Sequence, residues 1–274
     1  MKRLLSFIIV LAIIGAAVFG VKQYFSPKEP VSLSAHGIGS QFDPIYVTAH
    51  RGGNTEAPEN SLPSFRSAVQ KNFYAAECDI LRTKDGKWVI THDDSVINHF
   101  FGTGKVSEMT FDEVRKLKYS FDTAFWEYQD EKIPSLEEYL DVLAGSNTRP
   151  EIEIKSKTTE GLEDVLSALR ARSLTKQAII ISFHYECLER IHELDKSIEL
   201  WYLMDDITDD GIDKALKIGC KAISANYKNT GAEDVAMVLD SGLKLVVWTV
   251  DSPETVSTFY NMGVRYFVTN KLGI

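Results

Sequence analysis

The chain has few of the residues and motifs that mark several common protein classes. Basic residues are outnumbered, with 30 Lys and Arg against 39 Asp and Glu, which gives a net charge of −9. An acidic chain lacks the basic surface on which general nucleic-acid binding depends, and it has no overall attraction to anionic lipid. Neither G-x-G-x-x-G nor G-x-x-x-x-G-K-[ST] occurs, so nucleotide-binding folds that use these loops lose support.

Cysteine is also scarce. The three cysteines, Cys78, Cys187 and Cys220, fall inside apparent strands or helices and do not form a disulfide framework. We interpret them as buried small apolar side chains, although one pair remains available for a disulfide if the domain is exported. No cysteine follows the apolar N-terminal run, which argues against a lipid-attached lipoprotein.

The N-terminus carries a membrane-targeting pattern. Residues 1–3 (Met-Lys-Arg) precede an uncharged run over 4–21, and 18 residues at about 1.5 Å each are just enough to cross a bilayer core. A cleaved signal peptide needs a small-x-small site after the apolar core, and 20–23 offers none. We therefore expect an uncleaved signal anchor at 1–21 that leaves the bulk of the chain on the extracytoplasmic side, or a secreted protein if the segment is cleaved. The Pro-, Ser- and Gly-containing stretch 22–44 is predicted to be a tether.

Residues 45–274 alternate between strand-like and helix-like segments. The strand candidates are 45–49, 74–81, 87–91, 151–155, 178–183, 199–203, 221–224, 244–250 and 265–269. The helix candidates are 60–71, 135–144, 160–171, 185–194, 209–218, 231–241 and 252–262. Alternation of this kind indicates βα units around a parallel sheet. Without 87–91, the return strand of a hairpin, eight strands remain, so the pattern predicts an α/β fold of the (β/α)8 TIM-barrel type.

Residues 93–134 interrupt the alternation. This segment contains two adjacent phenylalanines, a Gly-x-Gly, a short helix-like run at 110–118 and a second aromatic group at 125–128. Long insertions in compact domains are often lids or binding loops. A small inserted subdomain that packs its own aromatic side chains is the structural alternative, and both interpretations remain open from the sequence.

A hairpin is expected between 74–81 and 87–92, because the connection is too short for a parallel crossover. Residues two apart on a strand face the same way, so Glu77 and Asp79 share a face. If Asp85-Gly86 is a two-residue turn, His92 lies opposite Asp79. A register shift of one residue would place them on different faces.

Carboxylates from separate strands form a candidate metal site. Glu77, Asp79 and Glu153 are predicted to converge at the C-terminal ends of barrel strands, where barrel enzymes carry their chemistry. Three like charges in one place repel each other unless a cation joins them. Oxygen ligands alone suit one divalent cation, Ca²⁺ or Mg²⁺, rather than Zn²⁺.

Two histidines and two cations complete the candidate site. His50 and His92 are suited to general acid and base roles near neutral pH. Arg51 and Lys155 provide cationic groups for an anionic substrate, and arginine can bind phosphate through two hydrogen bonds. This combination fits phosphodiester cleavage better than aldol or isomerase chemistry. The other histidines, His36, His99, His184 and His192, are interpreted as structural or surface residues.

These residues also form a recognisable pattern. The chain resembles the glycerophosphodiester phosphodiesterase family in a series of blocks: His50-Arg51-Gly52, Pro58-Glu59-Asn60-Ser61, Glu77-Cys78-Asp79, Asp85-Gly86, His92-Asp93, Gly102-Thr103-Gly104, Ile133-Pro134-Ser135-Leu136-Glu137-Glu138, Glu151-Ile152-Glu153-Ile154-Lys155 and Val247-Trp248-Thr249-Val250. The resemblance implies a (β/α)8 barrel with a small insertion, and His50 and His92 as the catalytic pair. It implies Glu77, Asp79 and Glu153 as ligands of one divalent cation, with Arg51, Lys155 and Trp248 on the substrate.

The function implied is metal-dependent hydrolysis of a small glycerophosphodiester to glycerol 3-phosphate and an alcohol. The chain departs from the family's pattern at 98–101, where Arg-Thr-Thr is usual, and at 269–272, where Thr-Asp and a proline are usual. These departures concern the leaving group and the pocket rim. One alternative is action on lysophospholipids or envelope glycerophosphate polymers, and the other is a non-catalytic tethered module that binds phosphodiesters. The sequence does not decide the oligomeric state.

Overall fold

A closed barrel of parallel strands forms the centre of the molecule. The structure is a computed structural model that describes residues 31–32, 44–120 and 126–273. The main sheet has nine strands in the order β2-β12-β11-β10-β9-β8-β7-β3-β4, and a further β2–β3 pairing closes it. Eight of these strands are mutually parallel, which confirms the predicted barrel: β2 Tyr46–Ala49, β3 Ala75–Arg82, β7 Arg149–Ile154, β8 Ile179–Ser182, β9 Glu199–Met204, β10 Ala222–Asn226, β11 Lys244–Trp248 and β12 Tyr266–Thr269.

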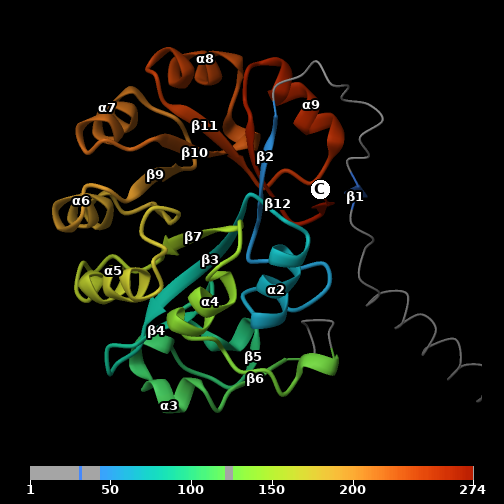
Figure 1. Cartoon of the computed structure of the whole chain (residues 1–274), viewed down its shortest axis with the longest axis vertical. Coiled ribbons are helices and arrows are strands. Elements are labelled where there is room, and N and C mark those ends of the chain that lie inside the picture. The colour runs from blue at the N-terminus through green and yellow to red at the C-terminus, as the bar shows by residue number, and fades with distance from the viewer. Residues whose placement is uncertain (1–30, 33–43, 121–125, 274) are drawn as a thin grey trace, which may run out of the picture.

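Helices surround the barrel, as Figure 1 shows for the ring from α5 to α9. They follow the predicted segments closely, as α2 Leu62–Gln70, α4 Leu136–Leu143, α5 Leu162–Ala171, α6 Tyr185–Leu194, α7 Asp209–Lys217, α8 Ala232–Asp240 and α9 Pro253–Asn261. Ser135 and Glu138 form a capping box at the start of α4. Gly219, Gly242 and Gly263 follow helix ends with positive φ angles of 72°, 84° and 103°, a conformation that suits glycine.

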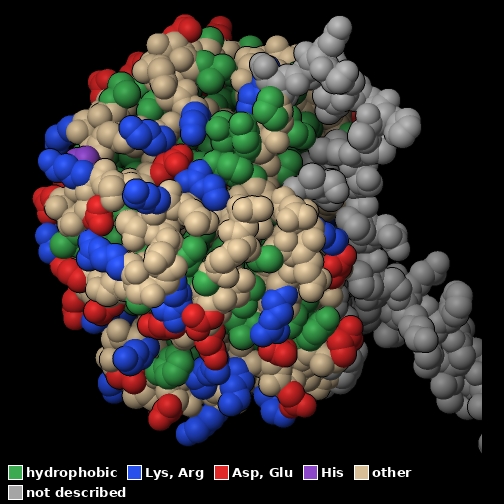
Figure 2. Space-filling view, in the orientation of Figure 1, with side chains coloured by type: hydrophobic (Ala, Val, Ile, Leu, Met, Phe, Trp, Pro, Cys, Tyr) green, Lys and Arg blue, Asp and Glu red, His purple; other side chains and the backbone are tan. Residues whose placement is uncertain are grey.

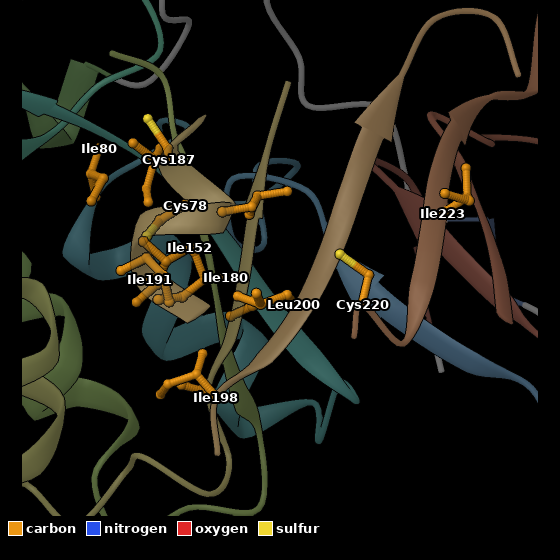
Figure 3. Packing of buried hydrophobic residues seen from close by; sticks show 14 of the residues in the cluster. Cys78, Ile80, Ile152, Ile180, Cys187, Ile191, Ile198, Leu200, Cys220 and Ile223 are labelled. Carbon is orange, nitrogen blue, oxygen red and sulfur yellow. The ribbon is translucent and has the colours of Figure 1, made fainter. Parts of the chain in front are cut away.

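The hydrophobic core has two parts. Between the sheet and the helices, side chains such as Cys78, Ile152, Ile180 and Ile191 pack together (Figure 3). Inside the barrel, a second cluster is formed by Ala75, Ile179, Ile181, Trp201, Leu203, Ala222, Val246 and Val268. Cys78, Cys187 and Cys220 are buried and free, so the interpretation of the cysteines as apolar core residues is confirmed and a disulfide between them is absent.

The N-terminal end of the barrel is closed by polar and aromatic side chains. Arg149 at the start of β7 pairs with Glu199 at the start of β9, with Nη2 and Oε2 2.7 Å apart. Trp201 is fully buried beside them and donates its indole N–H to Glu199 Oε1 at 2.9 Å. A ligand therefore has access to the barrel interior from the C-terminal end of the strands.

The hairpin forms, but the predicted register is wrong by one residue. Strand β4 (Trp88–Ile90) runs antiparallel to β3, with Ile80 opposite Ile90 and Arg82 opposite Trp88. The turn is longer than the two residues expected, because Thr83 N–H bonds to Lys87 O at 2.8 Å around Gly86, whose φ is 83°. Thr91, rather than His92, therefore donates its N–H to Asp79 O at 3.1 Å.

The segment 93–134 is a small subdomain as far as it is described. It holds α3 (Phe111–Val114), a two-stranded sheet of β5 (Phe100–Phe101) and β6 (Lys118–Tyr119), and the short 3₁₀ turns Val96–Asn98, Val106–Glu108 and Trp126–Tyr128. Val96, Phe100, Val106, Val114, Tyr119 and Ile133 form its own core together with Leu81 and Val89 of the hairpin. Figure 1 shows it beside α4 and β4, outside the ring of helices.

The predicted signal anchor at 1–21 lies outside the described residues, as does most of the predicted tether. Within that tether, β1 (Val31–Ser32) pairs in parallel with β13 (Leu272–Gly273) at the C-terminus. Among the described residues, no helix is long and apolar enough to span a bilayer. On the surface, acidic and basic side chains are interspersed over the face seen in Figure 2.

Candidate active site

The turn after the first barrel strand sets the direction of two candidate side chains. Strand β2 ends at Ala49, and Arg51 and Gly52 follow with φ angles of 56° and 80°. A Cβ at Gly52 would lie 2.4 Å from Ser64 Oγ, so helix α2 packs directly on a backbone that only glycine permits. This close packing holds His50 and Arg51 at the C-terminal mouth of the barrel.

The three predicted carboxylates lie together at this mouth. Asp79 on β3 is paired in register with Glu153 on β7, and Glu77 lies two residues earlier on the same face of β3. One oxygen atom from each of Glu77, Asp79 and Glu153 lies within 4.8 Å of the other two. The prediction that these three carboxylates converge is therefore confirmed.

The electrostatics of the cluster disfavour three ionised carboxylates at this spacing without a nearby cation. Burial, followed by Asp79 and Glu153, raises the pKa of Glu77 well above its usual value. Burial and Asp79 likewise raise the pKa of Glu153 to about 7. Burial alone would raise the pKa of Asp79, but Arg51 and Lys155 hold it below its usual value. Close carboxylates with opposed pKa shifts are typical of catalytic or metal-binding sites.

The donor set fits a hard divalent cation. All three groups offer carboxylate oxygen, the ligand type that Ca²⁺ and Mg²⁺ prefer. Glu77 Oε2 accepts the backbone N–H of Arg51 at 2.8 Å, which fixes the carboxylate. Its other oxygen, Oε1, is buried and has no hydrogen-bond partner among the described residues. A bound cation would give that buried oxygen a partner.

Asn60 holds Asp79 in position, a contact that the sequence reasoning missed. Its Nδ2 donates to Asp79 Oδ2 at 2.8 Å, and its Oδ1 accepts the backbone N–H of Asp79 at 3.2 Å. Asn60 has a φ of 55° and donates its own N–H to Arg51 O at 3.0 Å. The only sequence signal for this role is its place in the block Pro58-Glu59-Asn60-Ser61.

The two cationic side chains that were predicted to bind the substrate form ion pairs with the carboxylates. Lys155 Nζ lies 2.9 Å from Glu153 Oε1 and 3.6 Å from Asp79 Oδ1. Arg51 Nη1 lies 2.8 Å from Glu59 Oε1, and Nε lies 3.3 Å from Asp79 Oδ2. Burial alone would lower the pKa of both cations, but these acidic partners raise it, so both side chains stay charged.

His50 is held by a neutral partner from the last barrel strand. Its Nδ1 donates to Asn270 Oδ1 at 2.8 Å. Asn270 is oriented by Asp251, which accepts its Nδ2–H at 3.3 Å, and by Asn54, whose Nδ2 donates to Asn270 Oδ1 at 2.7 Å. Burial and then Arg51 lower the pKa of His50, so its ring is neutral near pH 7.

His92 has a charged partner instead. Its Nδ1 donates to Asp93 Oδ1 at 2.7 Å, and Asn98 Nδ2 donates to the other oxygen of Asp93 at 2.8 Å. His99, interpreted from sequence as structural, lies near the same group, with Nε2 3.5 Å from Asp93 Oδ2. His92 lines the same cavity as His50 despite the register shift, because β4 ends at Ile90 and His92 lies beyond the paired residues.

A cavity of about 260 Å³ opens at this site. The candidate residues His50, Arg51, Glu77, His92, Glu153, Lys155 and Trp248 all line it. Trp248 packs edge-to-face on Phe183 with ring centroids 5.8 Å apart. Five further residues line it, although no role was predicted for them: Glu151, Ile181, Leu203, Ser224 and Val268. The cavity thus joins an acidic cluster, two imidazoles and an aromatic wall.

Solved structures with a similar fold include a phosphodiesterase from Oleispira antarctica, in complex with the product sn-glycerol-3-phosphate. It has a TM-score of 0.77 and 24% identity, with 82% of this chain and 93% of that chain covered. A glycerophosphodiester phosphodiesterase from Parabacteroides distasonis has a TM-score of 0.71 and 26% identity, with 84% and 94% covered.

Sequence comparison agrees with the fold. A glycerophosphodiester phosphodiesterase from Bacillus subtilis is 30% identical over 261 residues, which is 88% of each chain. The family model described as "Glycerophosphoryl diester phosphodiesterase family" matches residues 50–274. The chain therefore belongs to the glycerophosphoryl diester phosphodiesterase family of enzymes.

Proposed function

We propose that the chain hydrolyses glycerophosphodiesters to glycerol 3-phosphate and an alcohol, with one divalent cation held by Glu77, Asp79 and Glu153. The observation that carries this proposal is the convergence of these three carboxylates, two of which, Glu77 and Glu153, line one cavity with His50 and His92. A bound cation would polarise the phosphoryl group and neutralise charge that develops on its oxygens. The donor set is compatible with either Ca²⁺ or Mg²⁺.

The different partners of the two imidazoles support different roles. The Asn270 amide fixes the Nδ1–H tautomer of His50 without adding charge, which leaves the Nε2 lone pair to accept a proton. Asp93 accepts the Nδ1–H of His92 and so orients the ring, an arrangement that suits the proton donor of the pair. We therefore assign His50 as the general base and His92 as the general acid.

The proposed reaction begins when His50 takes the proton from an attacking hydroxyl. The resemblance to the family supports the glycerol hydroxyl next to the phosphate ester as this first nucleophile, which gives a cyclic phosphate. His92 gives its proton to the departing alkoxide, so that the alcohol leaves neutral. Water then opens the cyclic ester with the roles of the imidazoles reversed. Arg51 and Lys155, both charged and lining the cavity, bind the non-bridging oxygens.

Product analysis tests the substrate class. Glycerophosphocholine and lysophosphatidylcholine are incubated with the purified protein and Ca²⁺ or Mg²⁺, and phosphorus NMR identifies the products. We expect glycerol 3-phosphate from glycerophosphocholine. Faster turnover of lysophosphatidylcholine would favour the lysophospholipid alternative, for which the exposed Ile97 and Phe101 of the inserted subdomain provide apolar surface. A protein that binds but releases no product would be a non-catalytic module.

We also propose that residues 1–21 anchor the enzyme to the membrane with its barrel on the extracytoplasmic side. The uncharged run 4–21 after Lys2 and Arg3 supports this orientation. Two experiments test this proposal. Membranes from expressing cells are washed with alkaline carbonate, and an anchored protein should stay in the pellet. Intact spheroplasts are treated with protease, which should digest an extracytoplasmic barrel, whereas a barrel protected from protease would contradict the orientation.

A further inference from the structure

The cavity has a second polar region, deeper in the barrel than the carboxylate cluster. Glu151 precedes Glu153 by two residues on β7, so its side chain faces the barrel interior one layer further down. Ser224 faces the interior from β10, whose neighbours in register are Leu203 on β9 and Val246 on β11. Both side chains line the cavity, and both are buried, with 0% and 1% of their surface exposed.

These side chains have hydrogen-bonding capacity that the protein does not use. Glu151 Oε1, Ser224 Oγ and Trp248 Nε1 are buried, and none has a hydrogen-bond partner among the described residues. The other oxygen of Glu151 accepts the hydroxyl of Thr48 at 3.0 Å, which fixes the direction of the carboxyl group. Buried polar atoms in folded proteins almost always have partners. Three buried polar atoms without partners on the wall of a single cavity indicate that a ligand provides their hydrogen bonds.

We infer that Glu151, Ser224 and the indole N–H of Trp248 form a hydroxyl-recognition subsite, which binds the far hydroxyl of a compact, uncharged polyol. The inference rests on the proposed function, in which the polyol is the glycerol moiety of the substrate. It adds Glu151 and Ser224 as specificity-determining residues, and it sets which end of the substrate enters the barrel.

The chemistry of the three groups selects a hydroxyl. An indole N–H only donates a hydrogen bond, so its partner must be an acceptor. A carboxyl oxygen accepts a hydrogen bond, and a serine hydroxyl can donate or accept one, so a partner that both donates and accepts satisfies all three groups. A hydroxyl group does both. A quaternary ammonium has neither an N–H nor a lone pair, and an acyl chain leaves all three groups unpaired.

The shape of the barrel sets the orientation of the substrate. Ile181, Leu203 and Val268 form apolar walls around the polar groups, and the fully buried Trp201 closes the barrel beyond them. Only a small moiety fits between this closed end and the carboxylate cluster. Phe183, 36% exposed, lies at the open side of the cavity. The polyol therefore enters the barrel, and the alcohol that leaves faces solvent.

A pair of substrates tests this subsite without disturbing the attacking group. One is a glycerophosphodiester, and the other is its propanediol analogue, which keeps the hydroxyl next to the phosphate ester and has hydrogen in place of the far hydroxyl. We expect wild-type kcat/KM to fall on the order of 100-fold for the analogue, because buried polar groups lose their partner.

Variants test whether the named residues discriminate between the glycerol substrate and its propanediol analogue. Ser224→Ala is expected to lower kcat/KM about 10-fold for the glycerol substrate and to have little effect on the analogue, which narrows the gap between the two. Glu151→Gln is also expected to narrow the difference in kcat/KM between the two substrates. Ile181→Val, which alters the same wall without a polar atom, should affect both substrates alike. Equal effects of Ser224→Ala and Glu151→Gln on both substrates would overturn the inference.

A binding experiment separates the subsite from the proposed reaction. Titration calorimetry compares glycerol 3-phosphate with propanediol phosphate in the presence of Ca²⁺. Tighter binding of glycerol 3-phosphate, lost in Ser224→Ala, supports the subsite even if the enzyme hydrolyses neither diester, in which case only the proposed reaction fails. Equal affinity for the two monophosphates overturns the subsite, whatever the enzyme hydrolyses.

Discussion

His50 Nδ1 lies 2.8 Å from Asn270 Oδ1, although the two residues are 220 positions apart in the chain. The contact joins the first and the last strand of the barrel at the point where they pair. Burial and Arg51 lower the pKa of His50, and the amide at this position adds no charge that opposes them, whereas a carboxylate would stabilise the charged form of the ring. The acidic limb of the pH profile should therefore depend on residue 270.

Asn270→Asp tests this dependence. The free enzyme should lose kcat/KM as pH falls through the lowered pKa of His50, because the base becomes protonated. The new carboxylate should raise that pKa and move the acidic limb upward by about 1–2 pH units. Asn226→Asp, at a strand end where the side chain caps a 3₁₀ turn, is the control with the same added charge. A limb that moves equally in both variants, or in neither, contradicts the assignment of His50.

Asp93→Asn addresses the proposed acid. The amide removes the carboxylate that accepts the Nδ1–H of His92, and it can present its own N–H to Nδ1 and favour the wrong tautomer. We therefore expect kcat to fall on the order of 100-fold. Asp94→Asn is the matched control, because Asp94 accepts hydrogen bonds from Ser107 instead of a histidine. An unchanged kcat in Asp93→Asn would contradict the role of this pair.

Glu77→Gln tests the carboxylate cluster directly. The variant keeps the shape of the side chain and loses one of the three charges, so cation affinity and activity should both fall by 10-fold or more. Scanning fluorimetry should show that Ca²⁺ or Mg²⁺ raises the Tm of the wild type and raises that of Glu77→Gln much less. Glu163→Gln, on the exposed side of α5, should behave as the wild type. A full cation response in Glu77→Gln would place the cation elsewhere.

The raised carboxyl pKa values predict how stability depends on pH without a cation. Burial raises the pKa of Glu151 to about 8, and that of Glu153 is raised to about 7. A raised folded-state pKa means that the folded protein binds protons which the unfolded chain has released. The free energy of unfolding should therefore fall as pH rises from about 4.5 to about 8. Chelated protein should unfold at a lower temperature at pH 8 than at pH 6.

Glu151→Gln checks the origin of that slope, because an amide does not titrate. The variant should gain on the order of 1–3 kcal/mol over the wild type at pH 8 and show a flatter dependence on pH. Ser224→Ala changes the same cavity without removing a titrating group, so its slope should match the wild type. A wild-type slope that survives in Glu151→Gln would assign the effect to other groups.

Much of the fold was predictable because local patterns carry it. The alternation of strand-like and helix-like segments gave all nine strands of the main sheet, and the i, i+2 spacing placed Glu77 and Asp79 on one face. The hairpin register was wrong because a turn with Gly86 at positive φ adds one residue to the loop. Periodicity along a strand does not reveal the length of its turn.

The supporting residues of the site were not predictable in the same way. Asn270 and Asn60 meet their partners, and Ser224 reaches the cavity wall, only after the barrel closes, and these residue types have no special chemistry in isolation. Glu151 was visible as the first residue of Glu151-x-Glu153-x-Lys155, but its depth in the barrel depends on the strand register. Sequence spacing identified the carboxylates, imidazoles and cationic side chains that meet at the site, and long-range packing determined the residues that orient them.

In the proposed mechanism, one cation held by three carboxylates between two imidazoles drives phosphodiester cleavage. The decisive experiment measures the rate of glycerol 3-phosphate release from glycerophosphocholine, first in chelator and then after Ca²⁺ or Mg²⁺ is restored. We expect no measurable release in chelator, full recovery with the cation, and no recovery in His50→Ala. Release that continues in chelator, or a His50→Ala protein as active as the wild type, would rule this mechanism out.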